Sequence, residues 1–196
     1  MQMIFNAGVD ASEYQRQGKD FAFPDLAGTL CPQCMGDLLR KHGFYKRYLI
    51  LLYFIGTIFI RRYICDACGK TVSLLPSFAH PGRTYGINFI IGTLSQYYVE
   101  EKCVMDSVRS FNNEDTASCS RQLFLHFRKR FEENLSALIS ETIVVFSLRG
   151  PPVTEKDTRK RGKQYLECVR SLKPKDVSKK IFEHSRMTYL SPLPSQ

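Results

Sequence analysis

One uncharged and strongly apolar stretch of the sequence, "YLILLYFIGTIFI" at residues 48–60, has basic residues at both ends. A membrane-spanning helix needs about 20 apolar residues, so this stretch is too short to cross a bilayer. Its β-branched and aromatic residues favour strands, and Gly56 favours a turn or bend. The pattern predicts a long hairpin, with strands at residues 43–54 and 57–64 and a turn near Gly56. Both faces of the hairpin are partly apolar, so we expect another segment to cover it.

From residue 85 the apolar residues recur at spacings of three and four, which is typical of amphipathic helices. We predict a helix at residues 85–98, a shorter one at residues 102–111, and a third that begins near Thr116 or Ser118, either of which is a suitable N-cap. The third helix has a stripe of apolar residues that we expect to be buried: Phe124, Phe127, Phe131, Leu135 and Leu138.

The predicted hairpin lies between two CxxC pairs, "CPQC" and "CDAC". Two such pairs around a strand-rich insert are typical of a four-cysteine zinc ribbon. The expected ligands are Cys31, Cys34, Cys65 and Cys68. Four sulfur ligands leave no open position for water or substrate, so the predicted Zn²⁺ is structural. A membrane hairpin, a thioredoxin-like motif and unbound thiols are the alternatives, but the second would carry a single CxxC that opens a helix.

Three further residues that bind metals elsewhere are not expected to do so here. His80 stands in "SLLPSFAHPGRTYG", whose prolines and glycines exclude a helix, and four cysteines already satisfy the predicted metal. We therefore expect His80 to be a loop histidine. Cys103 and Cys119 are expected to be small packed residues.

Positive charge is concentrated in two parts of the chain. The formal net charge is +9, and residues 31–80 contribute +5 while residues 148–196 contribute +7. Such charge indicates a polyanionic partner, either nucleic acid or an acidic membrane surface. The first 30 residues lack the pattern of a secretory signal, so a cytoplasmic location with reduced cysteines is the expectation.

The three predicted helices, with "NNED" before the third, match a helix-turn-helix that binds double-stranded DNA. The third helix would place serine, arginine and glutamine in the major groove and further basic residues near phosphates. The expected DNA-contacting residues are Ser118, Ser120, Arg121, Gln122, Arg128, Lys129 and Arg130. The alternative is an ordinary three-helix bundle with solvated charges.

The predicted fold class is α+β: a zinc ribbon, a three-helix bundle and a basic tail. The expected domains are an N-terminal extension at residues 1–27, the ribbon at 28–80, the helical domain at 84–147 and the tail at 148–196. The tail is expected to be flexible or to add phosphate contacts, with one short amphipathic helix. That helix would contain Tyr165, Leu166, Val169 and Leu172.

The segments "CPQC", "KHGFYKRYLI" and "IRRYICDACGKTVSLLPSFAHPGRTYG" carry a family resemblance. Together with the helices, over roughly residues 28–140, they resemble the zinc-ribbon and helix-turn-helix front end of bacterial insertion-sequence transposases. They look closest to short proteins with this front end that are classed as a domain of unknown function. The resemblance implies that the four cysteines hold zinc and that residues 116–130 contain the recognition helix.

Full transposases of this kind continue into an RNase H-like domain with metal-binding acidic residues. The residues after Ser140 are mostly basic and polar and show no such group of carboxylates. We therefore expect a DNA-binding protein that is not an enzyme. It would be a stand-alone regulator or a fragment that acts with a separate transposase catalytic subunit. A protein-interaction module, in which the apolar hairpin docks a partner chain, is the alternative from another class.

Overall fold

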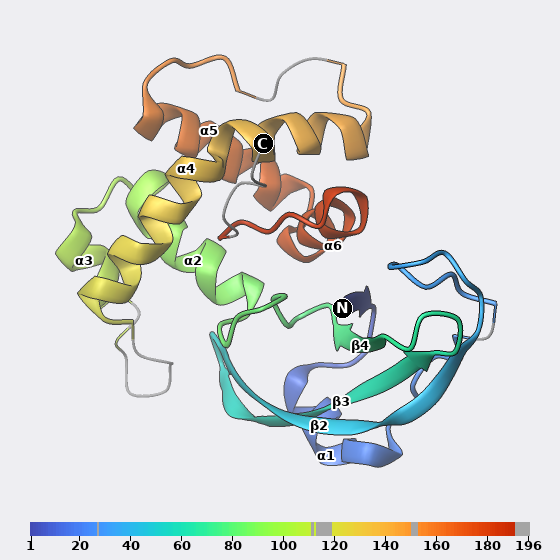
Figure 1. Cartoon of the computed structure of the whole chain (residues 1–196). Coiled ribbons are helices and arrows are strands. Elements are labelled where there is room, and N and C mark those ends of the chain that lie inside the picture. The colour runs from blue at the N-terminus through green and yellow to red at the C-terminus, as the bar shows by residue number, and fades with distance from the viewer. Residues whose placement is uncertain (27, 111, 113–118, 150–152, 191–196) are drawn as a thin grey trace. The chain divides into compact units, whose positions relative to one another are not determined.

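The computed structural model shows a mixed α+β protein (Figure 1). By its internal contacts the chain divides into two compact units, Met1–Ile50 with Phe54–Thr84, and Leu51–Tyr53 with Tyr85–Gln196. We call them the sheet unit and the helical unit. The structure describes the whole chain except residues 27, 111, 113–118, 150–152 and 191–196.

The sheet unit contains a four-stranded sheet with the order β1-β4-β3-β2. β1 runs parallel to β4, with Gln2 opposite Ser73, and β3 runs antiparallel to β4, with Arg61 opposite Leu74. The long strand β2 therefore forms one edge of the sheet. The bounds of the strands are Gln2–Phe5 (β1), Leu39–Leu51 (β2), Phe54–Cys65 (β3) and Thr71–Pro76 (β4).

The apolar stretch forms the predicted hairpin, but its turn is not at Gly56. β2 and β3 are joined by Leu52 and Tyr53, and Gly56 lies inside β3. A Cβ atom at Gly56 would lie 2.7 Å from the side-chain nitrogen of Gln15 and 2.8 Å from the ring of Phe54. The glycine therefore permits close packing in a strand, a role that sequence reasoning mistook for a turn. In the described part of the chain, no helix has the length and apolarity needed to span a membrane.

The N-terminal segment covers the hairpin, as the apolar faces required. Helix α1 (Ala11–Gln17) begins after Asp10, whose side chain accepts a hydrogen bond from the Glu13 N–H, and it is followed by the short 3₁₀ helix η1 (Gly18–Asp20). The Tyr14 hydroxyl donates to the Phe59 carbonyl at 3.0 Å. Figure 1 shows α1 against the curved hairpin. Residues 1–27, which we predicted to be an extension, supply β1 and α1 and so form part of this unit.

The helical unit contains the three predicted helices, α2 (Ile87–Tyr98), α3 (Val104–Arg109) and α4 (Arg121–Phe146). α4 begins after Ser120, whose hydroxyl accepts the Leu123 N–H at 3.1 Å. The alternative N-caps that we predicted, residues 116 and 118, lie outside the described residues. The predicted apolar stripe of α4 is buried as expected: Phe124, Phe127, Phe131, Leu135 and Leu138.

The basic tail is folded rather than flexible, which corrects our expectation. It forms α5 (Thr158–Ser171) and α6 (Pro174–Ser185), and both helices pack against α2 and α4. The Tyr165 ring lies 6.0 Å from the Phe131 ring, centroid to centroid. Basic residues occupy the outer faces, while a helical stripe of apolar residues is buried. The buried residues include Tyr165, Leu166, Val169, Val177, Ile181, Tyr189 and Leu190.

Candidate metal centre and basic helix

The hairpin brings the two cysteine pairs together at one end of the sheet unit. All four sulfurs lie within 4.8 Å of one another. The Cys31 and Cys68 sulfurs are 3.9 Å apart, and those of Cys34 and Cys65 are 3.6 Å apart. Four sulfurs at about 2.3 Å from one tetrahedral ion are about 3.8 Å from each other. The four cysteines therefore fit a metal ion with little rearrangement.

The first cysteine pair forms a tight turn stabilised by its own backbone. The Cys31 N–H donates to the Gly36 carbonyl at 2.7 Å, and the Met35 N–H donates to the Cys31 carbonyl at 2.9 Å. Gly36 is packed closely, because a Cβ atom there would lie 3.0 Å from the Cβ of Ala67 and 3.4 Å from the Cys34 sulfur. The turn thus aims both sulfurs at one point and leaves room only for glycine beside them.

The second pair folds in the same way. The Cys65 N–H donates to the Lys70 carbonyl at 3.0 Å, and the Gly69 N–H donates to the Cys65 carbonyl at 2.8 Å. The Asp66 N–H also donates to the Leu38 carbonyl at 3.0 Å, which ties the second turn to the start of β2. Two CxxC sequences far apart in the chain therefore give two matching knuckles that face each other.

The electrostatics of the first knuckle favour the thiolate at Cys31 but not at Cys34. The Gly36 backbone N–H lowers the pKa of the Cys34 thiol, but hydrogen bonds with the neighbouring thiols and burial raise it to about 12. Burial raises the pKa of the Cys31 thiol. Hydrogen bonds from the backbone N–H groups of Gln33 and Cys34 and from neighbouring thiols lower this pKa by more, so that it falls to about 7. The thiolate is the form that binds a metal. Cys31 and Cys65 are buried, whereas Cys34 is exposed and Cys68 is half-buried. All four are reduced in the structure and make no disulfide.

A comparison of the two knuckles predicts how a substitution at Met35 changes stability. Met35 has φ +60° and occupies the position that Gly69, with φ +67°, occupies in the second knuckle. A left-handed conformation costs a residue other than glycine about 1–2 kcal/mol. Met35→Gly should therefore stabilise the metal-loaded protein by up to about 1 kcal/mol in denaturant unfolding. The greater freedom of glycine in the unfolded chain offsets part of the strain that the change removes. Gly69→Ala, the matched change in the opposite direction, should destabilise it; equal effects of both changes would contradict this account.

The first turn of α4 presents two of the predicted DNA-contacting residues. Arg121 and Gln122 are exposed, and both follow the N-cap Ser120. The Ser120 hydroxyl oxygen already accepts a backbone N–H, so this serine has a structural role. Ser118 lies outside the described residues. The arrangement places one arginine and one amide side by side at a helix end whose inner face is buried.

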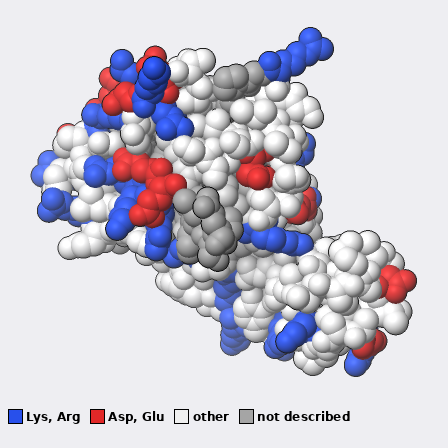
Figure 2. All heavy atoms as spheres, turned by 45° about the horizontal axis from the view of Figure 1, so that its top comes forward, with Lys and Arg blue, Asp and Glu red and all other residues white. Residues whose placement is uncertain are grey.

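The remaining basic candidates on α4 have acidic partners. The guanidinium of Arg128 lies 3.7 Å from the Glu132 carboxylate, and that of Arg130 lies 3.0 Å from the Glu133 carboxylate. Lys129 is 4.0 Å from Glu133. Figure 2 likewise shows acidic side chains directly beside basic ones on the face in view. These pairs reduce the positive potential that we expected on this part of α4, and the signal for them, "RKRFEE", was visible in the sequence.

Comparison with known families gives a match to part of the chain. A family model described as "Domain of unknown function (DUF6431)" matches residues 31–115, from the first cysteine of the metal centre to the segment that follows α3. No curated protein matches the chain. No solved structure matches it either. The match agrees with the expected likeness to a domain of unknown function, and the likeness to transposases stays a prediction.

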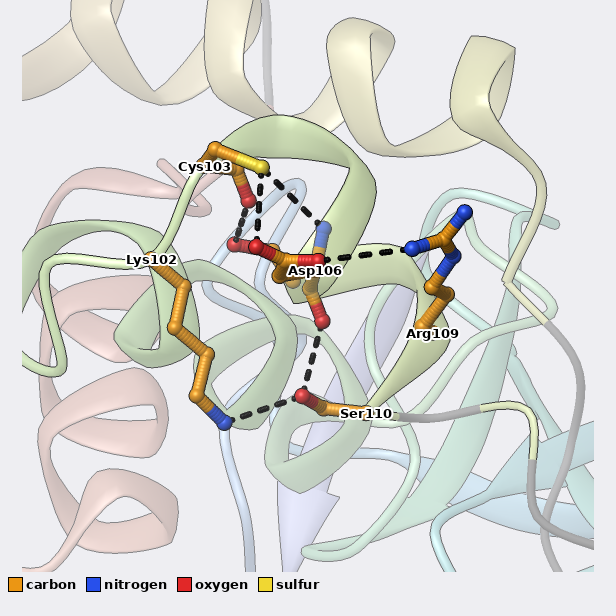
Figure 3. Close-up of polar contacts among 6 residues, drawn as sticks. Lys102, Cys103, Asp106, Arg109 and Ser110 are labelled. Atoms are coloured by element: carbon orange, nitrogen blue, oxygen red, sulfur yellow. Dashed lines mark hydrogen bonds and ion pairs between the residues drawn. The ribbon is translucent and has the colours of Figure 1, made fainter.

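Cys103 is not the packed residue that we expected. It is exposed and caps α3: its sulfur accepts the Asp106 N–H at 3.4 Å and lies 3.1 Å from the Asp106 carboxylate (Figure 3). The same carboxylate lies 3.7 Å from Arg109, and Lys102 donates to the Ser110 hydroxyl at 2.9 Å. Cysteine is not one of the favoured N-cap residues, so the sequence carried no signal for this cap.

His80 and Cys119 agree with their predicted roles. His80 lies in the loop after β4, and its Nδ1 is 3.0 Å from the Pro81 carbonyl oxygen. Complete burial lowers the pKa of this imidazole to about 4, so it is neutral near pH 7. Cys119 is buried before α4. Among the described residues, neither belongs to a group of side chains that fits a metal ion.

Proposed function

We propose that this chain is a zinc-dependent DNA-binding protein in which α4 enters the major groove. The observation that carries the proposal is the exposure of Arg121 and Gln122 at the first turn of a helix whose opposite face is buried. Arginine reads guanine and glutamine reads adenine through paired hydrogen bonds. The net charge of +9 supports a polyanionic partner.

Zinc is the metal that suits the four cysteines. Zn²⁺ prefers tetrahedral sites built from thiolates, and such a closed site stabilises a fold without providing a catalytic position. The ion would hold the two knuckles together and thereby fix the open end of the hairpin, where β2 begins and β3 ends. In this proposal the metal acts on structure alone, and DNA contacts are made elsewhere on the chain.

Transposase ancestry belongs to the proposal as well. It rests on the phrase "RRYICDACGKTVSLLPSF" and on the order of the cysteine pairs and helices. In that setting the expected partners are double-stranded DNA and a separately encoded catalytic subunit, and the chain itself would supply binding without nuclease chemistry.

The proposed readout predicts the effects of two substitutions. Arg121→Ala and Gln122→Ala should each relax preference for one base pair, at a cost of about 1–3 kcal/mol for the best site. Selection of bound duplexes from a random pool measures that preference. Lys129→Ala, a change of an exposed residue further along the same helix, should weaken all sequences alike because it removes a phosphate contact.

Two outcomes would overturn the assignment to α4. If both variants select the same sequences as the original protein, the groove contact is wrong. If the protein selects no sequence and its affinity for duplex DNA does not change between low and high salt, phosphate contacts are absent and DNA binding itself is wrong.

A protein-interaction module is the second candidate, and one observation favours it. Three apolar side chains beside the metal centre are exposed, namely Leu30, Met35 and Leu38. Met35, at 65% exposure, projects from the first knuckle itself. Apolar groups gathered at one end of a unit are typical of a surface that docks a protein. The absence of salt-dependent DNA binding would favour this candidate.

A further inference from the structure

The sheet unit has a hollow of about 400 Å³ between β2 and the loop that follows β4. Its walls include three cationic side chains and, among the residues that line it, no carboxylate. The side chains that matter are Tyr45, Lys46, Arg47, Tyr48 and Arg83. The sequence alone does not show that these side chains line one hollow, because they come from two segments more than 30 residues apart.

Arg47 fixes the shape of the hollow. Its Nη2 donates to the His80 carbonyl at 2.6 Å and also to the Arg83 carbonyl. The Ile50 N–H donates to the Thr84 carbonyl at 3.0 Å, which ties the same loop to the end of β2. The two carbonyl oxygens orient the guanidinium but carry no full negative charge. Its positive charge is therefore held in place in the wall, and none of the described residues that line the hollow has a carboxylate to balance it.

A second hollow, in the helical unit, differs in its charge. It has a volume of about 290 Å³ and is lined by Arg159, Lys160 and Lys163 together with Glu101 and Asp157. The Lys163 ammonium lies 2.7 Å from the Glu101 carboxylate. Carboxylates in the wall oppose an anionic ligand there. On α4, Arg128, Lys129 and Arg130 are likewise paired with acidic residues, so the hollow beside β2 is the better site for an anion.

We propose that the hollow beside β2 binds a phosphate group of the nucleic-acid backbone. Lysine and arginine are the usual ligands of phosphate oxygens, and the hydroxyls of Tyr45 and Tyr48 would add neutral donors. This inference rests on the proposed function, and it assigns to the metal-bearing sheet unit a backbone contact separate from base readout by α4.

Two lysines provide a matched test. The ammonium groups of Lys46 and Lys19 lie over the same Phe59 ring, at 5.8 Å and 5.3 Å from its centroid, but only Lys46 lines the hollow. Both side chains are exposed, so both alanine variants should fold. Affinity for a fixed duplex is measured over a series of salt concentrations. Lys46→Ala should make the slope of log K against log salt shallower by about 0.9, whereas Lys19→Ala should leave it unchanged.

The outcomes separate this inference from the proposed function. If the protein binds duplex DNA but the two variants have equal slopes, the contact between this hollow and the DNA backbone is wrong and DNA binding stands. If the protein binds no DNA, both proposals fall. Nuclear magnetic resonance with inorganic phosphate alone distinguishes a site for free phosphate. Shifts confined to residues 45–48 and 83, together with an unchanged duplex slope in Lys46→Ala, would also overturn the assignment to the DNA backbone.

Discussion

Replacing Cys31 or Cys65 by serine is expected to abolish metal binding and unfold the hairpin. Each residue supplies a buried sulfur from a different knuckle, so either change leaves three ligands. The start of β2 and the end of β3 would then no longer be linked through the metal. Structural zinc in small modules contributes about 10 kcal/mol or more to folding, which is comparable with the whole stability of an ordinary domain. Elemental analysis of metal content, combined with circular dichroism, measures both effects.

Cys103→Ser is the matched control for this change. Cys103 is a thiol of the same chain that caps α3 and lies outside the four-cysteine group. Serine is a favoured N-cap, so this variant should keep both the metal and the fold. If Cys31→Ser kept a full complement of metal and the stability of the original protein, the proposed role of the metal centre would be wrong.

Tyr165→Ala should produce the second largest effect, a loss of about 3–5 kcal/mol in the free energy of unfolding of the helical unit. The side chain is fully buried, its ring packs against Phe131 and Tyr189, and its hydroxyl lies 3.1 Å from the Thr142 hydroxyl. Removing the ring would leave a cavity among α4, α5 and the segment that follows α6. Urea unfolding followed by circular dichroism measures the loss.

Two controls show whether this effect comes from the buried ring. Tyr165→Phe keeps the ring and removes only the hydroxyl contact to Thr142, so it should cost about 1 kcal/mol. Glu167 is exposed on the same helix, and Glu167→Ala should change stability by less than about 0.5 kcal/mol. If Tyr165→Ala were as mild as Glu167→Ala, the basic tail would be the flexible segment that we first expected.

The parts of the fold that follow local patterns were predicted well. The β-branched and aromatic residues around position 56 indicated a hairpin, and the apolar spacing after residue 85 indicated α2, α3 and α4. The four cysteines were found because two CxxC pairs are a doubled local motif. Local sequence decides these features, since each depends on residues only a few positions apart.

The three errors about the fold concern partners that are distant in the sequence. Gly56 was taken for a turn because its close neighbour, Gln15, is 41 positions away. The pairing of β1 with β4 joins residues about 70 positions apart, and no periodicity in "QMIF" reveals it. In the tail, the apolar stripe with Tyr165, Leu166 and Val169 was predicted, but its burial against α2 and α4 was not, because those helices lie far away in the sequence. Composition describes the exposed face of such a helix better than its packed face.

X-ray absorption at the zinc edge of the purified chain tests the central claim most directly. Four cysteines whose sulfurs lie within 4.8 Å of one another should give one zinc per chain, surrounded by four sulfur atoms at about 2.3 Å. Folded protein that contains no transition metal, or a zinc whose neighbours are only nitrogen and oxygen, would contradict it.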